Sequence, residues 1–162
     1  MPPKKAQGPS KADLIRQQAA AAKQLKEEAW SNYWEHRKDH ITKGENKGGT
    51  PVGFHTKLLE GDGAVCKVFG AATPIPNSFG CYKQMVAVLS NANPVVGQKT
   101  KESTFFPTTF TLQDIEKVCK SAYMNATGQD MSKNFTATAT VAPGNGMKLN
   151  FTADSIYPQY DK

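Results

Sequence analysis

A glycine-rich segment in the first third of the chain places the strongest constraint on how it can fold. Four glycines and one proline lie between His40 and His55: Gly44, Gly48, Gly49, Gly53 and Pro51. Glycine adopts backbone angles that other residues avoid, and proline interrupts regular hydrogen bonding. The sequence therefore predicts an irregular loop from His40 to His55 that ends any preceding helix.

The chain before this loop favours a single long helix. Residues 1–9 are rich in proline and lysine and predict a disordered basic tail. Ser10 is a candidate N-cap, and alanine, glutamine, lysine and glutamate dominate the residues that follow. We expect a helix within residues 10–37 whose apolar stripe packs against a core: Leu14, Ala21, Leu25, Trp30, Tyr33 and Trp34.

The rest of the chain mixes strands and helices. Strands are expected at residues 64–69 and 81–89, with a turn around Pro74, Pro76 and Asn77 between them, and a long connection is expected at residues 91–109. Residues 112–123 show helical spacing after Thr111, a plausible N-cap. The alternation in 135–141, the turn at 143–146 and the segment 147–152 predict a hairpin, and the whole order is typical of an α+β fold.

Composition and charge narrow the function classes. The chain has 162 residues, with 20 lysines and arginines against 14 acids, a formal net charge of +6. This balance suits a polyanionic partner such as RNA. No apolar run of about 18 residues predicts a membrane span. The first residues lack the apolar segment of a secretory signal, so we expect a cytoplasmic protein, or one exported without a Sec-type signal.

Cysteine and histidine usage argues against a recognised metal site. Cys66, Cys81 and Cys119 are far apart and lack CxxC spacing, which predicts free thiols. The pair His40 and His55 is open to three interpretations: metal ligands, a proton-transfer pair, or unrelated surface residues. A zinc site needs three or four ligands, and the carboxylates near these histidines show no recognised spacing. We therefore predict no metal site.

Proton transfer explains the histidines better. Cleavage of RNA through the ribose 2′-hydroxyl needs a base for the 2′ proton and an acid for the departing 5′ oxygen. Histidine performs both roles near neutral pH, because its ordinary pKa is about 6.5. The charge that grows on the phosphorane needs a cation, and a lysine can provide it. A glycine-rich loop between the histidines would let both imidazoles reach one phosphate.

Four segments in order resemble one nuclease family. The segment HITKGENKGGTPVGFH, from His40 to His55, resembles the EndoU signature in its bacterial polymorphic-toxin form, which is related to the coronavirus uridylate-specific endoribonuclease. PNSFGCY at 76–82, STFFP at 103–107 and SIYP at 155–158 resemble later conserved segments of that family. The resemblance covers about residues 38–160 and leaves the leading helix outside.

The resemblance implies roles for individual residues. His55 corresponds to the general base and His40 to the general acid. The cation corresponds to Lys99 or Lys101, with Lys83 as an outside candidate. The substrate-binding positions that the resemblance implies are Ser103, Thr104, Ser155 and Tyr157, of which the last two would read uracil and pack on the ribose. No cofactor is implied, and dependence on manganese stays open.

Together these features predict an EndoU-like α+β core at residues 38–162, with two small antiparallel sheets and flanking helices, preceded by the helix of 10–37. The expected activity is cleavage of single-stranded RNA at uridylates to a 2′,3′-cyclic phosphate. Such a nuclease would suit a toxin effector with a cognate inhibitor or immunity protein. The alternatives are a non-catalytic RNA-binding module and a partner-binding protein that uses the leading helix. The sequence leaves the oligomeric state open.

Overall fold

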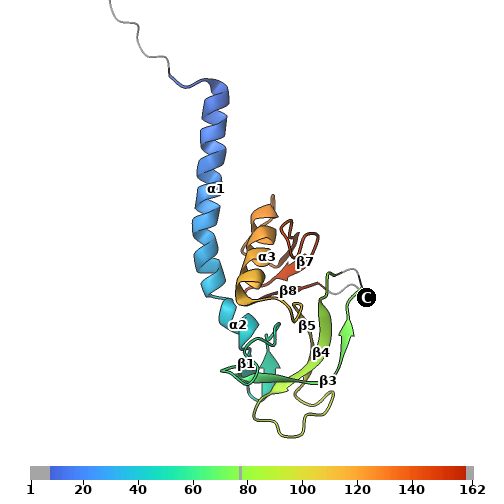
Figure 1. Cartoon of the computed structure of the whole chain (residues 1–162). Coiled ribbons are helices and arrows are strands. Elements are labelled where there is room, and N and C mark those ends of the chain that lie inside the picture. The colour runs from blue at the N-terminus through green and yellow to red at the C-terminus, as the bar shows by residue number, and fades with distance from the viewer. Residues whose placement is uncertain (1–7, 77, 160–162) are drawn as a thin grey trace, which may run out of the picture.

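The leading helix stands out from the body of the protein (Figure 1). This computed structural model describes residues 8–76 and 78–159, so most of the expected tail at 1–9 and Asn77 of the expected turn lie outside the described residues. Helix α1 spans Lys11–Glu35. Ser10 is its N-cap, in a reciprocal capping box with Asp13 that satisfies two backbone N–H groups at the helix start.

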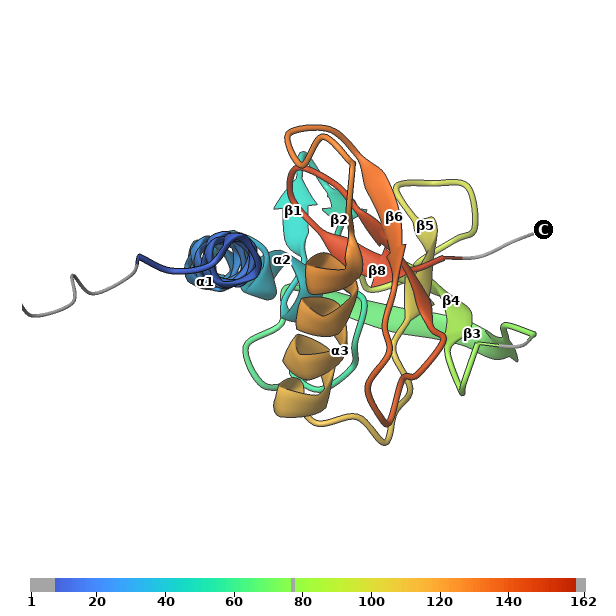
Figure 2. The same cartoon turned by 90° about the horizontal axis from the view of Figure 1, so that it is seen from above.

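Only the last turns of α1 pack against the body. Trp30 and Trp34 are buried and stack on each other, and Trp30 also contacts Tyr123 of the second long helix. Leu14 and Leu25 are 44% and 67% exposed. The predicted packing stripe is therefore wrong for the first part of the helix, which extends past the other described elements (Figure 1). Seen along its axis, α1 lies to one side of the body (Figure 2).

A short helix and a hairpin occupy the glycine-rich segment. Helix α2 (Lys38–Thr42) leads into strands β1 (Glu45–Lys47) and β2 (Thr50–Val52), which pair antiparallel. Gly48 and Gly49 form the two-residue turn with φ angles of +59° and +90°, as hairpin turns of this length require. The prediction of an irregular loop is wrong here, because the glycines serve a tight turn between paired strands.

The first of two three-stranded sheets has the order β3–β4–β5 and is antiparallel throughout. Its strands are β3 (Cys66–Pro74), β4 (Tyr82–Val88) and β5 (Lys101–Phe105). Two predictions are wrong. Pro74 ends β3 rather than starting the turn, and β5 lies inside the region expected to be a long connection. Phe54, Phe105 and Tyr82 pack a small core between this sheet and the segment after β2.

The second sheet has the order β6–β7–β8 and carries helix α3 on one face. Helix α3 (Leu112–Asn125) has Thr111 as its N-cap, as predicted. The strands are β6 (Phe135–Thr138), β7 (Lys148–Phe151) and β8 (Ile156–Pro158). Their alternate apolar residues pack on α3 and form the larger core, which Trp30 and Trp34 join.

The predicted α+β class and small antiparallel sheets are confirmed. The three cysteines are buried free thiols, as expected. No helix in the described part of the chain is long and apolar enough to cross a membrane. The division of the chain near residue 37 stays a prediction.

Candidate active site

The predicted site residues gather at one pocket of about 380 Å³, with the exception of Lys99. The pocket lies where α2, the segment after β2, strand β5 and the β7–β8 turn meet. Its lining consists of His40, Val52, Gly53, His55, Lys101, Glu102, Ser103, Thr104, Thr152, Asp154, Ser155 and Tyr157. Residues that are distant in sequence therefore share one cavity, as the proton-transfer hypothesis requires.

Backbone hydrogen bonds hold the two histidine segments together. The Phe54 N–H donates to the His40 carbonyl at 2.9 Å, and the His55 N–H donates to the Ile41 carbonyl at 2.7 Å. The chain that leaves β2 thus returns to α2, and both histidines reach the same pocket. Phe54 has a φ of +70° and a fully buried ring, so packing of this ring holds an unusual backbone conformation.

Gly53 allows this close return. A Cβ atom at this position would lie 2.2 Å from the His40 carbonyl oxygen and 2.8 Å from His40 Nε2. Its φ of +74° also disfavours any residue with a side chain. Gly53 is therefore a steric requirement of the paired-histidine geometry.

His55 is held in a tautomer suited to a base. Its Nδ1 lies 2.8 Å from the Thr104 carbonyl oxygen and 2.9 Å from Ser103 Oγ. A carbonyl only accepts, so Nδ1 carries the hydrogen and Nε2 keeps its lone pair. The Ser103 hydroxyl donates to the Phe54 carbonyl at 3.0 Å, which leaves its oxygen free to accept from Nδ1. Ser103 thus orients the imidazole.

The surroundings of His55 favour its neutral form. Burial lowers its pKa to about 3, and the positive charge of Lys101 acts in the same direction. The hydrogen bond to the Thr104 carbonyl opposes this shift. A neutral imidazole with a free Nε2 lone pair is the form that accepts a proton.

His40 has a different partner. It is buried, and its Nδ1 lies 3.1 Å from Oε1 of Glu45. This contact lowers the pKa of Glu45, so the carboxylate stays ionised and fixes the ring. Sequence reasoning did not include Glu45 among the site residues, although it lies within the segment from His40 to His55 that resembles the family signature. A carboxylate only accepts hydrogen bonds, so Nδ1 of His40 carries the hydrogen of this contact.

Lys101 is the lysine at the pocket. Lys101, Ser103 and Phe105 are every second residue of β5, so their side chains lie on the same face of the sheet, the face that meets His55. Burial lowers the pKa of Lys101.

The other two lysines point elsewhere. Lys99 is exposed, has a φ of +50°, and donates to the Gly48 carbonyl at 3.2 Å. Lys83 lies on β4, where its Nζ is 3.8 Å from Glu102, and it does not line the pocket. Of these three lysines, only Lys101 lines the pocket.

The second sheet supplies the opposite wall. The Tyr157 ring stacks on His55 with a centroid distance of 4.9 Å and an interplanar angle of 21°. Ser155 is buried, and its Oγ has no hydrogen-bond partner among the described residues; the same holds for Oγ1 of Thr104. Two buried hydroxyls thus line the pocket without partners, and a polar ligand would satisfy them.

The β7–β8 turn that carries Ser155 is itself fixed. The Thr152 N–H donates to the Ser155 carbonyl at 2.9 Å, and the Ser155 N–H donates to Thr152 Oγ1 at 3.0 Å. Arg37 Nε donates to the Thr152 carbonyl at 3.0 Å and ties the turn to the end of α1. Within the described residues, no group of three or more histidine, cysteine or acidic side chains could hold a metal ion.

The fold and pocket define a small α+β protein in which two buried histidines and a lysine line one pocket. A model of the bacterial EndoU nuclease family matches residues 35–160, and the chain belongs to this family. The protein is thus a nuclease, and the family indicates an endoribonuclease. Neither the comparison with curated proteins nor that with solved structures found a match.

Removing the charge of Lys101 should raise the pKa of His55. We expect the imidazole of His55 to titrate at higher pH in Lys101→Met than in the native protein, measured by NMR in the absence of RNA. Burial remains, so the pKa should stay below the ordinary value of about 6.5. The matched control Lys99→Met should leave the titration unchanged, and equal shifts in both variants would contradict the assignment.

The low pKa of His55 should also make the free energy of unfolding depend on pH. An unfolded histidine takes up its proton near pH 6.5, whereas folded His55 takes it up at about 3. The unfolded state therefore binds more protons within this window, and stability should fall as the pH drops from about 6.5 towards 3. Urea unfolding at several pH values should show less of this loss for Lys101→Met.

Gly53→Ala should damage both stability and activity. Gly48 offers a matched control, because its φ is also positive but a Cβ there would meet nothing within 4 Å. Gly48→Ala should cost only the left-handed strain of about 1–2 kcal/mol in urea unfolding. Gly53→Ala should cost more and should also lower RNA cleavage, because His40 must move. Equal losses of stability with full cleavage by Gly53→Ala would refute this account.

Proposed function

We propose that this protein is an endoribonuclease that cleaves single-stranded RNA at uridylates and leaves a 2′,3′-cyclic phosphate. One observation carries the proposal: two buried histidines with different partners line one pocket beside Lys101. Membership of the EndoU nuclease family supports the same reaction class. The partner is RNA, in accord with the net charge of +6.

The proposed reaction is a transesterification within the RNA. Nε2 of His55 takes the proton of the ribose 2′-hydroxyl, and the 2′ oxygen forms a bond to the adjacent phosphorus. The Lys101 ammonium neutralises part of the charge on the resulting phosphorane. The bond from phosphorus to the 5′ oxygen then breaks, and His40 gives its proton to that oxygen. The products are a 2′,3′-cyclic phosphate and a free 5′-hydroxyl.

Tyr157 and Ser155 suit the uridine itself. A tyrosine ring stacked on His55 can pack on the ribose and hold the 2′-hydroxyl near Nε2. The unpartnered Oγ of Ser155 lies on the same wall and can both donate to and accept from the edge of uracil. Thr104 and Ser103 complete the pocket, and Ser103 acts through its contact with His55 rather than on the base.

Cleavage should require the 2′-hydroxyl and both histidines. The substrate is a DNA oligonucleotide with one ribouridine, and the all-DNA oligonucleotide is its control. We expect cleavage only at the ribouridine, with product ends identified by mass spectrometry in EDTA and again with Mn²⁺. His40→Ala and His55→Ala should each lower the rate by roughly 10²–10⁴ while keeping the native melting temperature. Cleavage of the all-DNA strand, or a strict need for a metal, would contradict this mechanism.

Ser155→Ala should weaken the preference for uridine. If Ser155 bonds to uracil, its hydroxyl is left unpaired when cytidine is bound, which costs about 1–3 kcal/mol. The variant has no such hydroxyl, so its discrimination between uridine and cytidine should fall by this amount. The measurement is kcat/KM for two oligonucleotides that differ only in the cleaved nucleotide. The exposed Ser132 provides the control Ser132→Ala, which should keep the native ratio. An unchanged ratio in Ser155→Ala would remove this residue from base recognition.

We further propose that the nuclease acts as a toxin effector, held in check by a cognate inhibitor that covers the histidine pocket. The resemblance to polymorphic-toxin EndoU domains motivates this proposal. Inducible expression of the native chain in bacteria should arrest growth and fragment cellular RNA, whereas His55→Ala at the same protein level should do neither. Normal growth with soluble native protein would count against the toxin role and would leave the cleavage chemistry to the oligonucleotide assay.

A further inference from the structure

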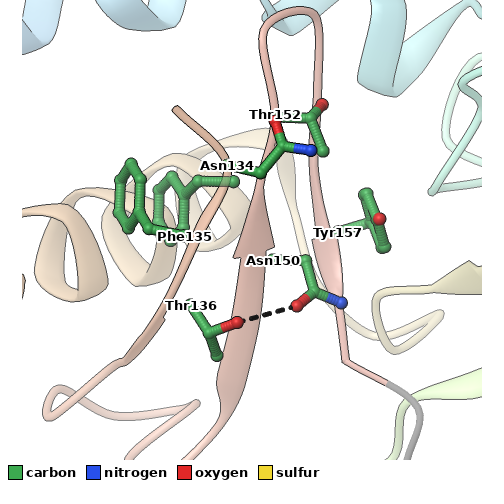
Figure 3. A pocket seen from close by; sticks show the side chains of 7 residues that line it. Asn134, Phe135, Thr136, Asn150, Thr152 and Tyr157 are labelled. Atoms are coloured by element: carbon green, nitrogen blue, oxygen red, sulfur yellow. Dashed lines mark hydrogen bonds between the residues drawn. The ribbon is translucent and has the colours of Figure 1, made fainter. Parts of the chain in front are cut away.

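A second pocket lies directly beside the histidine pocket, on the outer face of the β6–β7–β8 sheet (Figure 3). Its volume is about 270 Å³, and it shares Thr152 and Tyr157 with the histidine pocket. Its lining consists of Asn134, Phe135, Thr136, Asn150, Phe151, Thr152 and Tyr157. Tyr157 therefore forms a common wall between the two pockets.

Strand alternation explains why this face is polar. Phe135 and Phe151 pair across β6 and β7, stack at a centroid distance of 4.5 Å, and point into the core beneath the sheet. Thr136, Asn150 and Tyr157 form the next row across the three strands and face outward. The Tyr157 end of this row stacks on His55, whereas Thr136 at the other end is exposed, so amide, hydroxyl and aromatic groups lie side by side from the histidine pocket outward.

The side-chain amides of Asn134 and Asn150 on this face can bind a polar ligand. The Thr136 hydroxyl donates to Oδ1 of Asn150 at 3.0 Å, which fixes the amide plane and leaves its NH₂ group on the side away from Thr136 (Figure 3). Neither that NH₂ group nor the side chain of exposed Asn134 has a hydrogen-bond partner among the described residues. An asparagine amide offers both donors and acceptors, which match the edge of a nucleobase.

Charge distinguishes a base from a phosphate as the occupant. The lining contains no charged side chain, so nothing in it would attract a phosphate in particular. The exposed Lys148 lies two residues before Asn150 on the same face of β7, just beyond the pocket, where it can meet the backbone. The small volume suits one base rather than a longer segment.

We propose that this pocket is a subsite for the base of the nucleotide next to the cleaved one, with Asn150 as its recognising residue. The proposal rests on the proposed RNA cleavage in the histidine pocket. A strand whose cleaved ribose packs on Tyr157 passes its neighbouring nucleotide over the outer sheet face. Bases in single-stranded RNA are commonly held in this manner on an open sheet by hydrogen bonds and aromatic contacts.

The test removes single bases while keeping the backbone. The substrate is a trinucleotide with a central ribouridine and deoxynucleotides on both sides, and two further versions carry an abasic deoxyribose at the 5′ or the 3′ position. The readout is the ratio of kcat/KM for the intact trinucleotide to that for each abasic version. In the native protein we expect one of the two ratios to be about tenfold, the value of one good hydrogen bond to a base. The position that responds identifies the side of the cleaved uridine that the subsite serves.

Variants assign the effect to the pocket. In Asn150→Ala and in the equal-sized Asn150→Asp, the responding ratio should fall towards one, because the base has lost its partner. Asn93→Ala changes an exposed asparagine that lines neither pocket and should keep the native ratio. Melting temperatures show that each variant is folded. A native ratio in both Asn150 variants, or ratios of one at both positions in the native protein, overturns the subsite. No cleavage of any trinucleotide overturns the proposed function instead, and the subsite with it.

Discussion

The contact of Gly53 with the backbone of His40 is the constraint on which the active site depends. It lets the chain leave β2 and pair with α2, so that Phe54 and His55 donate to consecutive carbonyls of that helix. A Cβ atom at residue 53 would push the two segments apart, and the two histidine side chains could not then occupy their present positions. The short hairpin β1–β2 follows from the same constraint, because the chain must leave α2 and return to it within a few residues.

The fold then gives two chemically identical side chains different partners. His55 directs Nδ1 at the Thr104 carbonyl. Its burial and the charge of Lys101 favour the neutral ring, whereas the hydrogen bond to this carbonyl opposes them. His40 directs Nδ1 at the Glu45 carboxylate, which holds the ring in place. Two titratable groups in different surroundings are the usual starting point for assigning an acid and a base.

The sequence predicted what local physical chemistry determines. The capped helices at Ser10 and Thr111 and the alternating hairpin near 135–152 were predictable, because capping and periodicity are local signals. Strand β5 was missed because Lys101 to Thr104 are polar, and their strand is set by pairing with β4 and by the pocket they serve. The choice between Lys99 and Lys101 also needed tertiary structure, since residues two apart on a strand would share a face, and only the start of β5 at Lys101 separates them.

The pocket is built across two sheets, so its geometry depends on how they are joined. The β3–β4–β5 sheet supplies Lys101 and the partners of His55, while the β6–β7–β8 sheet supplies Ser155 and Tyr157. Arg37, which lies between α1 and α2, ties the second of these sheets to α1. Its Nη1 donates to the Tyr33 carbonyl, its guanidinium lies 3.4 Å from the Tyr33 ring centroid, and its Nε donates to the Thr152 carbonyl. A buried guanidinium with these partners is rigid, and it couples the end of α1 to the turn that carries Ser155. The last turn of the leading helix therefore helps to position one wall of the pocket, although the first part of the helix extends beyond the other described elements (Figure 1).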